Sequence, residues 1–72
     1  MRYTLHKPEL SAYHFDIDED QAEIVQHGEC GLSSKPELAA LFVGRRATVN
    51  AATARTIYAT LLQCGYVKWT EP

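Results

Sequence analysis

The spacing of the apolar residues changes halfway along the chain, and this change limits the folds that the chain can adopt. Residues 1–6 and 12–17 alternate apolar and polar side chains, which is the period of a strand with one buried face. Pro8 lies between these segments and lacks the N–H that a strand ladder needs. Residues 50–63 instead place apolar side chains three or four positions apart, as in an amphipathic helix. The sequence therefore predicts an α+β fold that begins with two antiparallel strands.

Residues 18–31 are open to two interpretations. Residues 18–21 are polar and suit a turn, so a third strand over residues 22–26 that completes a hairpin is the preferred prediction. A short helix that begins near Asp18 is the alternative, because acidic residues in a first turn match the helix dipole. Residues 28–32 contain two glycines and are expected to form a loop.

A first helix is predicted over residues 35–44. Ser34 and Glu37 have the spacing of a capping box. Pro36 stands in the first turn, where its missing N–H costs little. Gly44 is a natural C-terminal stop for this helix.

A second helix is predicted to follow at once. Asn50 or Thr48 is expected to cap it, and Gly65 is expected to end it. Residues 66–69 alternate again and predict a last short strand. The expected fold is a small antiparallel sheet of three to four short strands with two C-terminal helices packed on one face.

Length and composition favour one folded unit. Seventy-two residues are near the lower limit for a hydrophobic core without disulfides or metals, and residues 1–72 are expected to form a single small domain. No apolar run is long enough for a signal peptide or a membrane span, so a cytoplasmic protein without a membrane partner is expected. Cys30 and Cys64 are then expected to be buried thiols rather than a disulfide.

Charge is divided unevenly along the chain. Residues 1–34 hold two basic and seven acidic side chains, whereas residues 35–72 hold five basic and two acidic ones. The net charge of −2 therefore hides a dipole. Such a dipole indicates a basic partner for the acidic half or a polyanion for the basic half, and solvated surface charge is the simpler alternative.

No complete catalytic or metal-binding pattern is present. Three aspartates take the first, third and fifth positions of a calcium loop: Asp16, Asp18 and Asp20. Gln21 stands where that loop needs glycine. His27 and Cys30 have a spacing found in zinc sites, but a closed site needs a second pair of ligands. We therefore expect no enzymatic activity, no cofactor and no metal.

A protein partner is the leading functional hypothesis. Trp69 beside Tyr66 would be an interface anchor if exposed, and the acidic turn offers a charged surface. The residues expected at this interface are Trp69, Tyr66, Asp16, Asp18 and Asp20. The chain would then be a small regulatory or inhibitory binding module, of the size that phages and mobile elements encode.

Residues 32–39, LSSKPELA, resemble the opening of the helix-turn-helix in the GntR family of winged-helix transcription regulators. Further residues match the start of that family's recognition helix: Arg46, Thr48, Val49 and Ala52. The resemblance implies DNA binding. It also implies that Ser34 and Glu37 belong to the first helix, and that Arg46, Thr48 and Asn50 belong to the DNA-facing helix.

A DNA-binding regulator that uses the helix pair of residues 35–64 is therefore the alternative function. Its expected contacts with duplex DNA are Arg45, Arg46, Asn50 and Arg55. The residues that would end the recognition helix, 61–67, lie about five positions further along the chain than in that family. Five additional residues rotate a helix by roughly 140° beyond one full turn. A homodimer that completes a small core is a third hypothesis.

Overall fold

The computed structural model describes residues 2–8, 10–29, 31, 32 and 34–69. Its elements, in chain order, are β1 (Arg2–Lys7), β2 (Ser11–Asp18), β3 (Gln21–Gly28), α1 (Pro36–Ala39), β4 (Arg46–Asn50), α2 (Ala51–Gln63) and β5 (Val67–Trp69). No helix in these ranges is long and apolar enough to cross a membrane.

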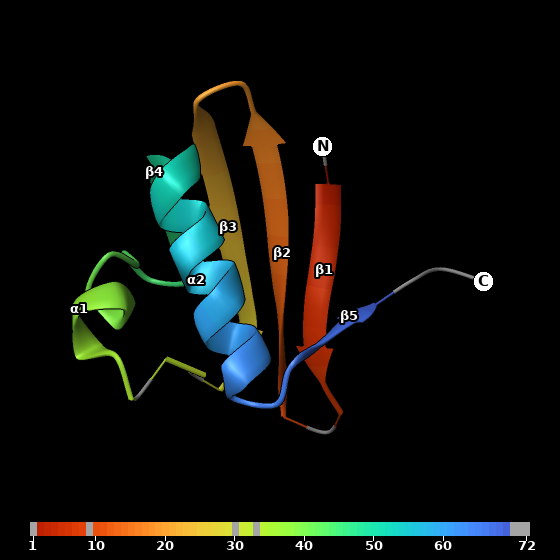
Figure 1. Cartoon of the computed structure of the whole chain (residues 1–72). Coiled ribbons are helices and arrows are strands. Elements are labelled where there is room, and N and C mark those ends of the chain that lie inside the picture. Colours follow the sequence, from red (N-terminus) through yellow and green to blue (C-terminus); the bar gives the residue numbers. More distant parts are fainter. Residues whose placement is uncertain (1, 9, 30, 33, 70–72) are drawn as a thin grey trace.

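The five strands form one antiparallel sheet in the order β4-β3-β2-β1-β5 (Figure 1). β2 and β3 pair along their whole length, from Ser11 opposite Gly28 to Asp18 opposite Gln21. β4 adds to the free edge of β3. α2 then carries the chain back across the sheet, so that β5 pairs with β1 at the other edge.

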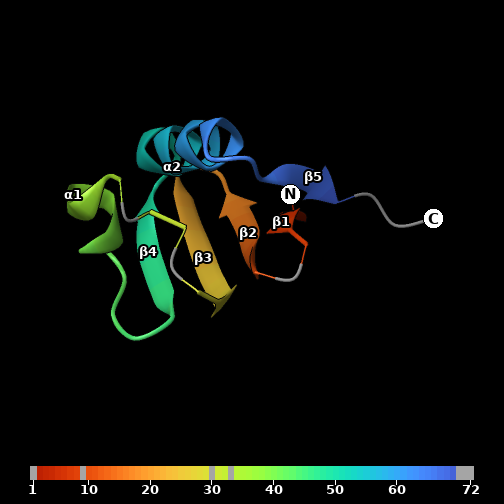
Figure 2. The same cartoon turned by 90° about the horizontal axis from the view of Figure 1, so that it is seen from below.

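One face of the sheet is covered and the other is not. α2 lies over one face, α1 lies beyond β4, and no described element crosses the opposite face (Figure 2). The strands alternate to match this arrangement. In β2, Tyr13 and Phe15 are buried, whereas His14 and Asp16 are exposed. We call the uncovered side the open face of the sheet.

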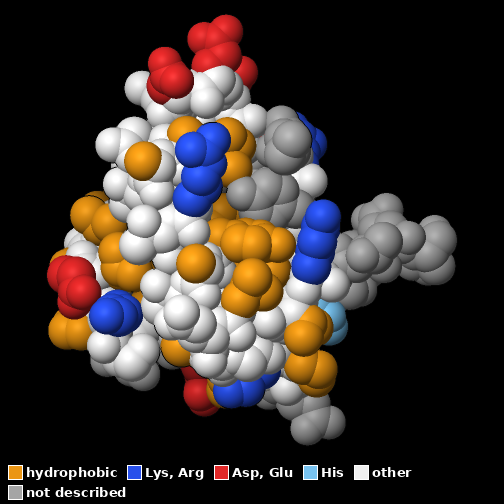
Figure 3. Space-filling view, in the orientation of Figure 1, with side chains coloured by type: hydrophobic (Ala, Val, Ile, Leu, Met, Phe, Trp, Pro, Cys, Tyr) orange, Lys and Arg blue, Asp and Glu red, His pale blue; other side chains and the backbone are white. Residues whose placement is uncertain are grey.

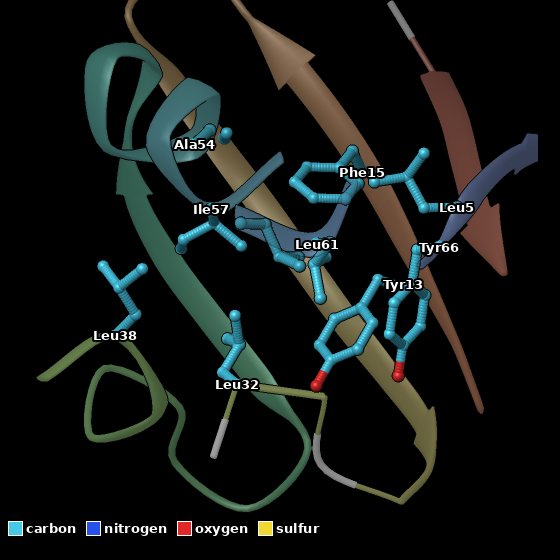
Figure 4. Packing of buried hydrophobic residues seen from close by; sticks show 11 residues of the cluster. Leu5, Tyr13, Phe15, Leu32, Leu38, Ala54, Ile57, Leu61 and Tyr66 are labelled. Atoms are coloured by element: carbon cyan, nitrogen blue, oxygen red, sulfur yellow. The ribbon is translucent and has the colours of Figure 1, made fainter. Parts of the chain in front are cut away.

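The hydrophobic core lies between α2 and the covered face (Figure 4). Its buried members are Leu5, Tyr13, Phe15, Ala22, Ile24, Leu32, Leu38, Ala54, Ile57, Leu61 and Tyr66. The ring of Tyr13 stands edge-on to two other rings, with centroids 5.8 Å from Phe42 and 5.6 Å from Tyr66. Edge-to-face packing is a favoured geometry for aromatic pairs. Tyr13 thereby joins the loop before β4 to the segment after α2.

Both ends of α2 follow the sequence prediction. The side chain of Asn50 accepts a hydrogen bond of 2.7 Å from the backbone N–H of Thr53, so Asn50 is the N-cap. Gly65 has a φ of 97° and ends the helix. The N–H of Tyr66 donates to the carbonyl of Leu61, and that of Gly65 donates to the carbonyl of Leu62. This pair of bonds is a Schellman motif, which requires the left-handed conformation that glycine tolerates.

Charged groups from distant parts of the chain lie beside both ends of α2 and its dipole. The N–H of Ala51 donates to the carbonyl of Asp20 over 2.8 Å, which holds the acidic β2–β3 turn beside the N-terminus of α2. Acidic side chains gather at the tip of this hairpin (Figure 3). At the other end, Nζ of Lys7 donates to the carbonyl of Cys64 over 3.2 Å. Negative charge near a helix N-terminus and positive charge near its C-terminus are both stabilising.

The third strand predicted over residues 22–26 is confirmed as β3, and the helical alternative for residues 18–31 is wrong. The sheet is larger than expected, with five strands instead of three or four. The additional strand is β4, in a segment predicted to connect or begin helices. Its alternation buries Ala47 opposite Ile24, and Thr48 and Val49 are β-branched residues that fit a pleated surface.

The first predicted helix is much shorter than expected. α1 has four residues, and its N-cap Lys35 makes no side-chain capping bond, so the capping box of Ser34 and Glu37 does not form. Pro36 does occupy the first turn, as predicted. Gly44, with a φ of 68°, turns the chain between Val43 and Arg46, which pair as a bridge.

Two neighbouring leucines in α2 provide a direct test of the core. Leu61 is fully buried, whereas Leu62 is 43% exposed. We expect Leu61→Ala to lower the free energy of unfolding by about 3 kcal/mol, because it leaves a cavity in the core. Leu62→Ala should cost less than about 1 kcal/mol. Urea unfolding of both variants measures this, and equal losses would contradict the packing described here.

The contact at the C-terminus of α2 gives a second prediction. Lys7→Met should lower the free energy of unfolding by about 0.5 kcal/mol at low salt, because it removes the cation at the negative end of the helix. The loss should shrink at high salt, which screens this interaction. Lys68→Met, at an exposed position in β5, is the control. A loss as large for Lys68→Met would show that the helix end is not the cause.

Candidate interaction surface

Cross-strand pairing arranges the side chains of the open face in rows. One row contains Arg2, Asp16, Glu23 and Thr48. The next row contains Thr4, His14, Val25 and Arg46. A third row contains Val67, His6, Ala12 and His27. The open face is therefore polar over most of its area, with acidic and basic side chains in adjacent rows.

All three histidines of the sequence lie on the open face, in two neighbouring rows. The rings of His14 and His27 meet edge to face, with centroids 4.7 Å apart. Nδ1 of His14 is 2.9 Å from Oγ1 of Thr4 on the adjacent strand. His6 pairs with Ala12, which places it diagonally across from His14. We call His6, His14 and His27 the histidine corner.

The surroundings of His14 disfavour its charged form. Partial burial lowers the pKa of the imidazole below its usual 6.5, and repulsion from His27 lowers that pKa further. At any given pH, a smaller fraction of His14 is charged than of a free imidazole. A neutral ring can pack against His27 and bond to Thr4 without placing a cation beside a second imidazole.

The opposite end of the open face is acidic. We define the acidic end as Asp16, Asp18 and Glu23. Nε of Arg2 is 3.4 Å from a carboxylate oxygen of Asp16, and Nη1 of Arg46 is 3.8 Å from one of Glu23. All four side chains are exposed, and each pair contributes less than about 1 kcal/mol. These carboxylates are held weakly enough to exchange their partners for charges on another molecule.

The structure separates the residues predicted to form a protein interface. Asp16 and Asp18 lie on the open face, whereas Asp20 belongs to the β2–β3 turn beside α2. Tyr66 is only 2% exposed, and its hydroxyl bonds to that of Ser11. Tyr66 was expected at an exposed interface, but the structure places it in the core. Trp69 pairs with Thr4 through the backbone of β5, and its side chain lies outside the described part.

The residues predicted to contact DNA do not gather on one surface. Arg46 points to the open face, whereas Arg55 is exposed on α2, across the sheet. Nη1 of Arg45 donates to the carbonyl of Gly28 over 3.1 Å, and Asn50 caps α2. The DNA-facing helix that the GntR resemblance implies for Arg46, Thr48 and Asn50 is instead strand β4. DNA binding by another arrangement stays an untested prediction.

No group of three or more potential ligand side chains in the described ranges is arranged to hold a metal ion. Asp16, Asp18 and Asp20 follow the hairpin rather than surrounding one point. The zinc spacing depends on Cys30, which lies outside the described residues. Cys64 is half-buried, with its Sγ 3.7 Å from Oγ of Ser34.

The histidine corner was missed in the sequence because its members are far apart along the chain. The signal that would have found it is the register of the β2–β3 hairpin. A two-residue turn after Asp18 places Val25 opposite His14, and His27 is then the diagonal neighbour of His14. Each histidine also falls at a position expected to face away from the core.

Comparison with known protein families, with curated proteins and with solved structures finds no match to this chain.

The lowered pKa of His14 predicts how stability depends on pH. The unfolded chain takes up the proton near pH 6.5, and the folded chain does so only at lower pH. The unfolded state therefore binds more protons in this window, and stability falls as the pH falls through it. At low protein concentration, the free energy of unfolding should be lower at about pH 5.5 than at about pH 7.5.

His14→Gln should reduce this pH dependence, whereas His6→Gln is the matched control for loss of an imidazole from the same face. Urea unfolding at both pH values measures the difference. If His14→Gln kept the pH dependence of the wild type, a group other than His14 would be its cause.

Proposed function

We propose that this chain is a small non-enzymatic module that binds another protein through the open face of its sheet. The observation that carries the proposal is the one-sided architecture. The core and α2 occupy one face of the sheet, and no described element covers the other (Figure 2). A sheet face of this kind is a platform whose side chains are positioned by strand pairing.

The chemistry of the open face suits reversible binding. Thr4, Thr48 and the imidazoles offer hydrogen bonds, and the acidic end offers charge. Val67 is 51% exposed and pairs with His6, so it adds apolar area at one margin. Polar surfaces with isolated apolar side chains are typical of partners that also exist apart.

A regulatory or inhibitory role is the form of binding that the open face suits best in this proposal. Such a surface acts most simply by occupying a surface of its partner. The rows of the open face span five strands, whereas a catalytic site would need groups convergent on one point. The function proposed is therefore steric: the bound module covers or holds a partner surface.

Site-specific crosslinking tests which face binds. A photoreactive residue at Thr48 reports on the open face, and one at Arg55 reports on the exposed side of α2. We expect Thr48 to crosslink one protein in the source cell, and Arg55 to crosslink none or far less.

Charge variants then test the chemistry. Asp16→Lys with Glu23→Lys should weaken the capture of that protein at least about tenfold, because it reverses the charge of the open face. Glu37→Lys, on α1, is the matched control and should leave capture unchanged. Crosslinking from Arg55 alone, or capture that survives both reversals, would overturn the assignment of the open face.

A further inference from the structure

We propose that the open face also binds a second copy of this chain at mildly acidic pH, with the acidic end of each copy against the histidine corner of the other. This inference rests on the proposed role of the open face as a binding surface. It names one occupant of that face and the condition under which the occupant binds.

The geometry makes the open face complementary to itself. The acidic end and the histidine corner follow one another along the same strands: on the open face of β2, His14 comes directly before Asp16, and Asp18 comes after it. A two-fold axis that runs across the strands, between two stacked sheets, reverses the strand direction of the second copy. Each acidic end then faces a histidine corner, and the contact occurs twice, as in any isologous dimer.

The groups around His14 explain why a second copy is needed. The charged or titratable neighbours on the open face are Arg2 and His6 from β1, Asp16 from β2, Glu23 and His27 from β3, and Arg46 from β4. Within one copy, a proton on His14 adds a positive charge beside His27. The carboxylates of Asp16 and Glu23 already pair with Arg2 and Arg46. Carboxylates from another copy would supply the missing negative charge.

The pH window follows from the two kinds of group. Imidazoles gain their protons below about pH 6.5, and carboxylates keep their charge above about pH 4.5. Carboxylates from a second copy favour the charged form of His14, so the contact is expected to strengthen as the pH falls between these limits. At higher pH His14 loses its proton, and the attraction weakens.

The size of the open face predicts a weak dimer. Five strands about 4.8 Å apart and about 20 Å long give an area of roughly 500 Å² per copy. The total of about 1,000 Å² is at the lower limit for a specific interface. An interface of this size is reversible, so a few charges can decide whether it forms.

The first experiment measures self-association of the pure chain by sedimentation equilibrium at about pH 7.5 and about pH 5.5. We expect the dimer dissociation constant to fall at least about tenfold at the lower pH. His14→Gln with His27→Gln should remove this change, and Arg55→Glu, on the other side of the molecule, should keep it. A monomer at both pH values, or a pH effect that survives the double glutamine variant, would overturn the proposal.

A charge-swapped pair provides the second experiment. Asp16→Lys with Asp18→Lys makes the acidic end basic, and His14→Glu with His27→Glu makes the histidine corner acidic. Neither variant should self-associate, whereas their mixture should form a heterodimer even at neutral pH. Circular dichroism confirms that each variant is folded. Folded variants that do not associate when mixed would exclude the proposed arrangement.

These outcomes differ from those that test the proposed function. Capture of a different protein is measured at neutral pH, where the chain is expected to be a monomer. A failure of self-association would therefore leave the capture result unchanged, and a failure of capture would leave the pH-dependent dimer intact.

Discussion

The packing of α2 against one face of the sheet is the contact on which the rest of the structure depends. Ala54, Ile57 and Leu61 provide the helix side of the core, and Phe15 and Ile24 meet them from the central strands. Thirteen residues make a helix of about 20 Å, which lies mainly along the strands, and the segment after it leads on to β5 at the other edge (Figure 1). One helix of this length covers one face only. The open face is therefore a direct consequence of the same contact that forms the core.

The elements with strong local signals could be predicted from the sequence. The alternation of β1 and β2 and the caps of α2 each depend on a few neighbouring residues, and the structure confirms them. The segment from Leu32 to Asn50 could not be predicted in this way. Its local signals favour a long helix, but Leu32, Leu38 and Phe42 all reach the core or pack against it, which a short helix and an irregular chain allow. Tertiary packing outweighs a capping-box sequence worth about 1 kcal/mol.

The candidate surface was predicted only in part for a related reason. Asp16 and Asp18 belong to a hairpin whose register is local; the sequence correctly makes Asp16 an outward position of a strand, whereas Asp18, expected in the turn, is the last residue of β2. The histidine corner requires the register of three strands at once, which no local pattern supplies. Tyr66 was misplaced because alternation suggested a strand residue beside Trp69. In the structure, the end of α2 controls its position, since Tyr66 completes the Schellman motif and turns its ring toward Tyr13.

The open face combines two requirements that usually conflict. An uncovered sheet face must be polar, because a broad apolar one would aggregate. A polar face, however, gives little binding energy, since its exposed ion pairs contribute weakly. Histidines reconcile these requirements because their charge is added only when protons are abundant. His27 is close enough to His14 to oppose its protonation, so a charge on His14 is costly for an isolated molecule. A partner that brings carboxylates to the histidine corner removes that cost, and its binding is thereby coupled to pH.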